Sequence, residues 1–160
     1  MSLASVRQFF AEYAPDVTII ELADSTATVE LAAKGHGVLP AQIAKTLCLR
    51  VGERNFLVVT RGDARLDNKK AKAVFGGKVS MLGAEDVLRL TSHPVGGVCP
   101  FGLPAPLPIY CDLSLKAFDE VVPAAGSTHS AVRIAPLRMA DLVKAEWVDV
   151  CQDPQPPISA

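Results

Sequence analysis

The sequence predicts an α+β fold, a single compact domain with a mixed β-sheet. Two runs of alternating apolar residues, 47–51 and 56–60, flank the polar turn Gly52-Glu53-Arg54-Asn55, which is typical of a β-hairpin. The predicted helices and strands follow one another without the strict alternation of an all-parallel α/β fold. A chain of 160 residues, of which 49% are hydrophobic, can close one core without disulfides or metals. We expect one domain over residues 1–153 and a flexible proline-rich tail over residues 154–160.

The composition argues against several classes of protein. The net charge is −1, so the chain as a whole does not attract a polyanion such as DNA. The four cysteines, at positions 48, 99, 111 and 151, form no C-x-x-C pair, and no His/Cys cluster has zinc spacing. No apolar run reaches the length of a transmembrane helix. We expect a cytoplasmic protein with reduced thiols, no metal or other cofactor, and neither a membrane nor DNA as a partner.

The first two elements follow from hydrophobic periodicity. Apolar side chains at positions 6, 9, 10 and 13 form the stripe of an amphipathic helix, and Pro15 ends it. The β-branched apolar run over residues 17–22 then predicts a strand.

The next helix is predicted from its end signals. Asp24 or Ser25 can cap a helix that runs to Lys34, and Gly35 can supply its left-handed stop. We place His36 in the turn that follows and assign it no chemistry, because a lone histidine between glycines is more often a turn residue than a ligand.

The hairpin and the elements around it complete the fold. A short helix over residues 39–44 leads into the first hairpin strand, which carries Lys45 near its start. Asp67 caps a helix over residues 68–75, and a glycine pair closes it. The remaining predicted elements, in order, are a strand over 79–82, a helix over 84–90, a strand over 109–112, a turn and strand within 115–122, a strand over 131–134, a helix from Pro136 to 144, and a strand over 147–150.

A glycine-rich loop at residues 95–103 is the first candidate site. Gly96 and Gly97 permit positive φ, so successive N–H groups can converge on an oxyanion or a carboxylate, and Pro100 stiffens the turn. The alternative is a structural turn with tight packing beneath it. The loop pattern does not decide between the two interpretations.

Four motifs in order resemble the YbaK family, the free-standing relatives of the editing domain inserted in prolyl-tRNA synthetases. The resemblance spans residues 24–150. Its pieces are Ile43-Ala44-Lys45-Thr46-Leu47, Arg61-Gly62-Asp63 followed by Leu66-Asp67 and Lys69-Lys70, the Gly-Gly-Val-Cys-Pro-Phe-Gly loop from Gly96 to Gly102, and Ala125-Gly126-Ser127-Thr128-His129.

The resemblance implies a function and a site. It implies a mixed sheet surrounded by helices, and hydrolysis in trans of mischarged aminoacyl-tRNA, mostly on proline tRNA, without a protein nucleophile. The implied catalytic groups are Lys45 and the backbone N–H groups of Gly97 and Val98, which can stabilise a developing oxyanion. The implied substrate contacts are Thr46, Gly96, Cys99, Pro100, Phe101, Gly102, Gly126, Ser127 and His129.

Other interpretations of these residues remain open. Lys45 can be an edge-strand lysine that keeps its ammonium in water. Cys99 can be a nucleophile with His93 or His129 as its base, although apolar neighbours raise the pKa of a thiol and favour a packed residue. His129 can contact the tRNA terminus or the aminoacyl group, or it can be a solvated turn residue.

Partners are predicted from a local basic patch. Lys69, Lys70 and Lys72 can contact tRNA phosphates, or they can form an ordinary solvated helix face. An aminoacyl-tRNA synthetase is a second candidate partner. The alternatives to a deacylase are a non-catalytic module of the same fold that binds tRNA or a synthetase, and an esterase that acts on other acyl groups.

Overall fold

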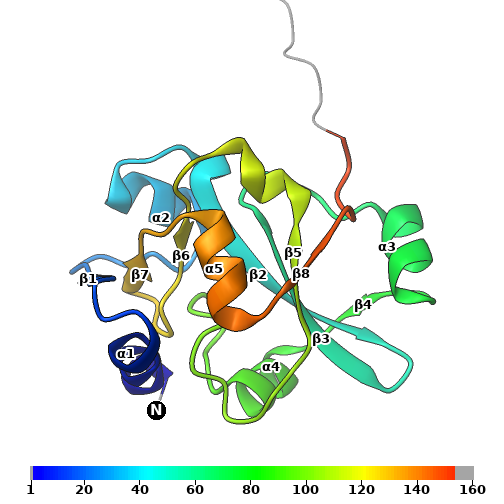
Figure 1. Cartoon of the computed structure of the whole chain (residues 1–160), viewed down its shortest axis with the longest axis horizontal. Helices are drawn as coiled ribbons and strands as arrows, with labels where there is room; N and C mark the ends of the chain where they lie inside the picture. The colour runs from blue at the N-terminus through cyan, green and yellow to red at the C-terminus, as the bar shows by residue number, and fades with distance from the viewer. Residues whose placement is uncertain (1, 154–160) are drawn as a thin grey trace, which may run out of the picture.

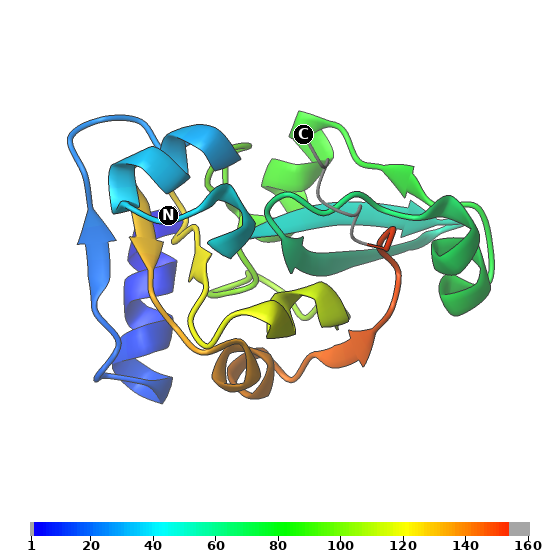
Figure 2. The same ribbon diagram turned by 90° about the horizontal axis from the view of Figure 1, so that it is seen from above.

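The computed structural model describes residues 2–153 (Figures 1 and 2). The predicted tail at residues 154–160 lies outside the described residues. The elements in chain order are α1 (Ser2–Tyr13), β1 (Ile19–Glu21), α2 (Val29–His36), the 3-10 turn η1 (Pro40–Gln42), β2 (Ile43–Val51), β3 (Arg54–Arg61), α3 (Asn68–Phe75), β4 (Ser80–Met81), α4 (Ala84–Thr91), β5 (Ile109–Asp112), the 3-10 turn η2 (Leu113–Ala117), β6 (Val122–Pro123), β7 (Ser130–Val132), α5 (Pro136–Val143) and β8 (Glu146–Val148).

The predicted mixed sheet is confirmed. Five strands run in the order β4-β2-β3-β5-β8, and β6 pairs with β2 as the sixth strand. The β2–β3 and β2–β4 pairs are antiparallel, whereas β2–β6, β3–β5 and β5–β8 are parallel. A separate antiparallel pair, β1–β7, lies at the end of the domain opposite α3 in both views (Figures 1 and 2). No helix of the described chain is both long and apolar enough to cross a membrane.

The hairpin strands are buried on both faces. On one face Leu49 and Val58 form a core with Phe75 of α3. On the other face Cys48 and Leu57 contact Val87 of α4. Successive side chains of a strand point to opposite faces, so Lys45 shares the α3 face with Leu47 and Leu49, and Thr46 shares the α4 face with Cys48.

One edge of β2 has a gap between two partner strands. The short strand β6 pairs with β2 at Ile43 and Ala44, and β4 pairs with it at Leu49 and Arg50. The Leu82 N–H extends the second pairing by donating to the Cys48 carbonyl at 3.0 Å. No strand of the described chain pairs with residues 45–47 on that edge, so part of β2 is open to a ligand.

The second predicted helix begins and ends later than expected. Its cap is Thr28, whose side chain accepts a hydrogen bond from the Leu31 N–H, and its left-handed stop is Gly37 with φ of 68°. Gly35, the predicted stop, lies inside the helix. His36 is the last helical residue, so its predicted place in the following turn is wrong. It is buried, and burial lowers the pKa of its imidazole. The helix predicted over residues 39–44 is only the short turn η1, because Ile43 already pairs with Val122.

Candidate functional site

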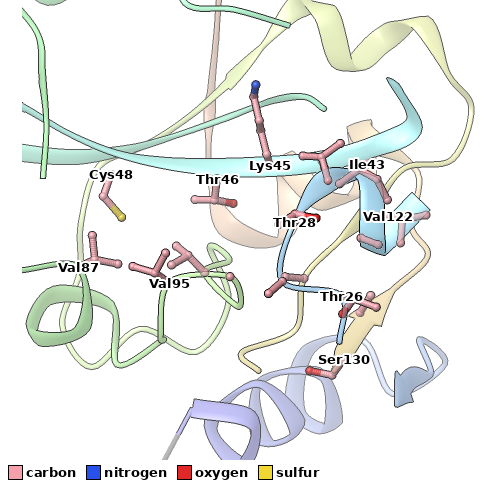
Figure 3. Close-up of a pocket in the computed structure, with 18 of the residues that line it drawn as sticks. Thr26, Thr28, Ile43, Lys45, Thr46, Cys48, Val87, Val95, Val122 and Ser130 are labelled. Atoms are coloured by element: carbon pink, nitrogen blue, oxygen red, sulfur yellow. The ribbon is translucent and has the colours of Figure 1, made fainter. Parts of the chain in front are cut away.

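A cavity of about 260 Å³ lies at the open edge of β2 (Figure 3). Its walls come from segments that are distant in sequence: the start of α2, strands β2 and β4, helix α4, the glycine loop, and the β6–β7 region. The lining residues are Thr26, Ala27, Thr28, Val29, Ala32, Ile43, Ala44, Lys45, Thr46, Cys48, Met81, Leu82, Val87, Val95, Gly96, Val98, Val122, Ala124, Ser130 and Ala131.

The lining is mostly apolar, with small side chains. None of these residues carries a carboxylate, and the polar ones are a lysine, three threonines, a serine and a cysteine. Burial raises the pKa of the Cys48 thiol to about 11, so that group is neutral. The cavity therefore suits a small and largely uncharged group.

Lys45 stands at the rim, with its ammonium turned away from the apolar part of the cavity. Figure 3 shows Lys45 projecting from one side of β2 and Thr46 and Cys48 from the other. The Lys45 Nζ donates a hydrogen bond of 2.5 Å to the Ala64 carbonyl. Burial lowers the pKa of this ammonium, and the Asp63 carboxylate opposes the shift. Lys45 thus places a cation beside the cavity, on the other side of β2 from the glycine loop.

Gly62 allows the segment carrying Ala64 to lie against η1. A Cβ at this position would be 2.1 Å from the Pro40 carbonyl oxygen and 2.9 Å from that of Ile43. Any side chain would push the segment away from β2, and with it the acceptor that holds Lys45. The sequence motif Arg61-Gly62-Asp63 therefore has a structural reason for its glycine.

The first half of the glycine loop lines the cavity. Gly96 has φ of 93°, and a Cβ there would lie 2.9 Å from the Ala27 Cβ. Gly96 and Val98 both line the cavity, and neither N–H donates to an acceptor within residues 2–153. Gly97 differs: its N–H donates to the Pro94 carbonyl at 2.9 Å, and a Cβ would lie 2.7 Å from the Ser127 backbone. Of the two glycines expected to permit positive φ, Gly96 adopts it and Gly97 does not.

The second half of the loop is buried under α1, outside the cavity. Phe101 is fully buried, with its ring centroid 4.7 Å from that of Phe10. Gly102 has φ of 64° and lies so close to Ser5 that a Cβ would be 2.7 Å from the backbone. Pro100 is buried as well. The structure therefore does not bring Cys99, Pro100, Phe101 or Gly102 to the cavity lining.

Cys99 is buried and is not placed to act as a nucleophile. Its exposed fraction is 0%, and burial raises the pKa of its thiol to about 12. The Sγ lies 3.5 Å from the His93 Nε2, which also lies 2.8 Å from the Phe101 carbonyl. Burial lowers the pKa of His93, so this pair holds a neutral thiol beside a neutral imidazole. A buried neutral thiol is a poor nucleophile.

The predicted segment from Gly126 to His129 forms a support behind the cavity. The Gly126 N–H donates to the Gly97 carbonyl at 3.0 Å. The Ser127 hydroxyl lies 2.7 Å from the hydroxyl of Ser130, which lines the cavity. His129 is exposed and is not part of the lining.

The basic patch lies on α3, at the end of the domain opposite β1 and β7 (Figures 1 and 2). Lys70 donates to the Asp149 and Asp153 carboxylates, so the fold already partly neutralises its charge. Lys69 and Lys72 are exposed. Among residues 2–153, no group of three or more His, Cys, Asp or Glu side chains could hold a metal ion.

Sequence reasoning missed most of the cavity walls. Ala32, Val122 and Ala131 look like ordinary core residues in the sequence, and only the tertiary fold brings them to one cavity. Thr28 carried a usable signal, because threonine is a preferred helix cap.

Comparison with known proteins identifies the family. A model of the aminoacyl-tRNA editing domain matches residues 23–142, more than half of the chain. The chain belongs to the aminoacyl-tRNA editing domain family. The solved structure of a "putative trans-editing enzyme for prolyl tRNA synthetase" superposes on this editing domain with a TM-score of 0.87 and 30% sequence identity, over 94% of this chain and 97% of that one. The predicted YbaK-type fold is confirmed.

Two relatives show how the editing domain occurs in other proteins. The YwhH protein of Bacillus subtilis, described as uncharacterized, is 44% identical over 96% of this chain and 99% of its own length. The proline–tRNA ligase of Bacillus licheniformis is 30% identical over 65% of this chain, which corresponds to 18% of the ligase. The same kind of domain thus occurs as a protein of similar length and as part of a ligase.

Proposed function

We propose that this chain is an aminoacyl-tRNA deacylase that hydrolyses mischarged aminoacyl-tRNA in trans. The observation that carries the proposal is the small cavity at the open edge of β2, lined by the Gly96–Val98 turn in an editing-domain fold. The substrate tRNA is proposed to be proline tRNA, because relatives include proline–tRNA ligases. A synthetase remains a proposed partner that could deliver the substrate.

The aminoacyl group enters the cavity, and the ester carbonyl lies against the glycine loop. Gly96 and Val98 are the proposed oxyanion donors, since the Gly97 N–H is already bonded to the Pro94 carbonyl. Each such donor contributes about 10²–10³ in rate. Gly97 supports the turn by packing on Ser127.

Water is the proposed nucleophile. It adds to the carbonyl carbon, the bond to the ribose oxygen breaks, and a proton passes from the water to the departing oxygen. Lys45 is the proposed cation that stabilises either the ester oxygen or the terminal phosphate of the tRNA. Contact with the phosphate leaves the ammonium on its present side of β2, whereas contact with the ester requires it to leave the Ala64 carbonyl. Lys69 and Lys72 are proposed to contact phosphates farther along the tRNA.

A panel of proline tRNAs mischarged with different amino acids tests this proposal. Release of free amino acid, at a rate above that of the uncatalysed ester, supports a deacylase. Binding of the same tRNAs without release would instead indicate a non-catalytic module. Hydrolysis of simple acyl esters but of no aminoacyl-tRNA would indicate the general esterase.

Replacement of Cys99 by alanine is expected to leave deacylation within about threefold of wild type, because the thiol is fully buried and Cys99 is not among the residues that line the cavity. The melting temperature should fall, since a fully buried side chain is truncated. Cys111→Ala is the matched control, because Cys111 is equally buried and also has a thiol pKa raised to about 12. A loss of several orders of magnitude for Cys99→Ala alone, with a trapped acyl-thioester on the wild type, would establish a cysteine nucleophile.

A further inference from the structure

Thr46 carries a buried hydroxyl that the protein itself leaves without a partner. Its Oγ1 is covered by neighbouring atoms and makes no hydrogen bond within residues 2–153, where the only other such side-chain atom is the His36 Nε2. Thr46 lines the cavity, and it projects from β2 on the same side as Cys48 (Figure 3). Buried polar groups are normally hydrogen-bonded, so an unpaired one calls for a specific explanation.

A ligand can supply the missing partner. A threonine hydroxyl and methyl exchange places by rotation about χ1, so the hydroxyl can turn toward the cavity when a bound group offers a hydrogen bond. A hydroxyl both donates and accepts, so it pairs well with another hydroxyl. It pairs weakly with a thiol and not at all with an alkyl group.

The side chain of the aminoacyl group is the part of the substrate that fits this position. Val87 and Val95 lie across the cavity from the side of β2 that carries Thr46 (Figure 3), and no lining residue carries a carboxylate. Burying the substrate ammonium there would leave a cation without a counter-charge, which is strongly unfavourable. The ammonium therefore stays at the mouth, and the side chain reaches the interior.

The cavity is small for a ligand site, and it is large enough for an aminoacyl side chain. A volume of about 260 Å³ lies below the range of roughly 300–1,000 Å³ typical of sites for drug-sized ligands. We propose that Thr46 is a specificity-determining residue that selects aminoacyl groups with a small hydroxyl-bearing side chain, serine or threonine, over alkyl isosteres. This inference rests on the proposed deacylase function.

The test compares two esters of equal shape on the same tRNA. Proline tRNA charged with serine is compared with proline tRNA charged with 2-aminobutyrate, which replaces the serine hydroxyl with a methyl group. For the wild type we expect kcat/KM to favour the seryl ester by about tenfold or more, because an apolar isostere leaves the hydroxyl unpaired. In Thr46→Val that ratio should fall close to one, and Thr46→Ser should restore most of it.

Stability gives a second readout. Thr46→Val removes an unpaired buried hydroxyl and keeps the shape of the side chain, so its melting temperature should equal or exceed that of the wild type. A structural role for the hydroxyl predicts the opposite, a lower melting temperature. If Thr46→Val loses selectivity but not stability, the Thr46 hydroxyl serves ligand binding rather than folding.

Several outcomes would overturn the assignment. If kcat/KM falls equally for both esters in Thr46→Val, the hydroxyl binds a part common to all substrates, such as the ammonium. A wild type that hydrolyses 2-aminobutyryl-tRNA as fast as seryl-tRNA would refute the selectivity while leaving the deacylase proposal intact. If the wild type hydrolyses no ester of the wider panel, both proposals fail.

Discussion

Alanine in place of Lys45 is expected to lower deacylation by about a hundredfold or more while the fold stays intact. The proposed mechanism needs one cation beside the ester or the terminal phosphate, and Lys45 lies on a strand fixed by pairing with β3. The Lys45 ammonium donates a partly exposed hydrogen bond to the Ala64 carbonyl. Loss of this bond should cost only about 1 kcal/mol of unfolding free energy. Single-turnover hydrolysis and a thermal melt measure the two effects.

The kinetic pattern of Lys45→Ala also locates the ammonium during catalysis. A loss mainly in kcat indicates contact with the ester in the transition state, whereas a rise in KM alone indicates that the lysine holds the tRNA terminus. Lys45→Arg keeps the charge and should retain part of the activity. If the alanine variant hydrolyses every mischarged tRNA at the wild-type rate, Lys45 has no role in the reaction.

The second large effect is expected at Gly62. Alanine there would place a Cβ 2.1 Å from the Pro40 carbonyl oxygen, and neither backbone segment can yield without moving β2 or the segment after β3. We expect a loss of about 2–3 kcal/mol in unfolding free energy, or roughly 5–10 °C in Tm for a domain of this size. Activity should fall as well, because the Ala64 carbonyl that holds Lys45 moves with the segment.

Gly83→Ala is the matched control for that variant. A Cβ at Gly83 would meet no heavy atom within 4 Å, and Gly83 does not have a positive φ. Its melting temperature should therefore change little. Equal melting temperatures for Gly62→Ala and wild type would show that the contact with Pro40 is looser than the structure indicates.

Local signals in the sequence predicted the elements that depend on neighbouring residues. The helix over 68–75 has the expected bounds, because Asp67 caps its N–H groups and Gly76 takes the left-handed conformation that ends it. The hairpin was also predicted from neighbouring residues, because two alternating apolar runs flank a polar turn. The end of α2 was missed because two glycines, Gly35 and Gly37, offer the same stop signal. Its start was missed because Asp24 and Ser25 offer the same cap signal as Thr28.

The candidate site was predictable only in part. Lys45, Thr46, Gly96 and Val98 were found through motifs, and the structure brings these four to one cavity. The Cys99 half of the loop was assigned to the substrate because it belongs to the same motif as Gly96 in the family resemblance. Its burial depends on contact with α1, from the other end of the chain, and no local pattern carries that information.

The gap in the edge of β2 also bears on aggregation. A strand edge with free N–H and C=O groups is a template on which another chain can add a strand. Here the free stretch is limited to residues 45–47, since β6 occupies the edge on one side and β4 on the other. A foreign strand would find too few residues to pair with before it met Val122 or Met81. Two very short strands therefore let the protein keep an open hydrogen-bonding edge for a ligand while denying it to other polypeptides.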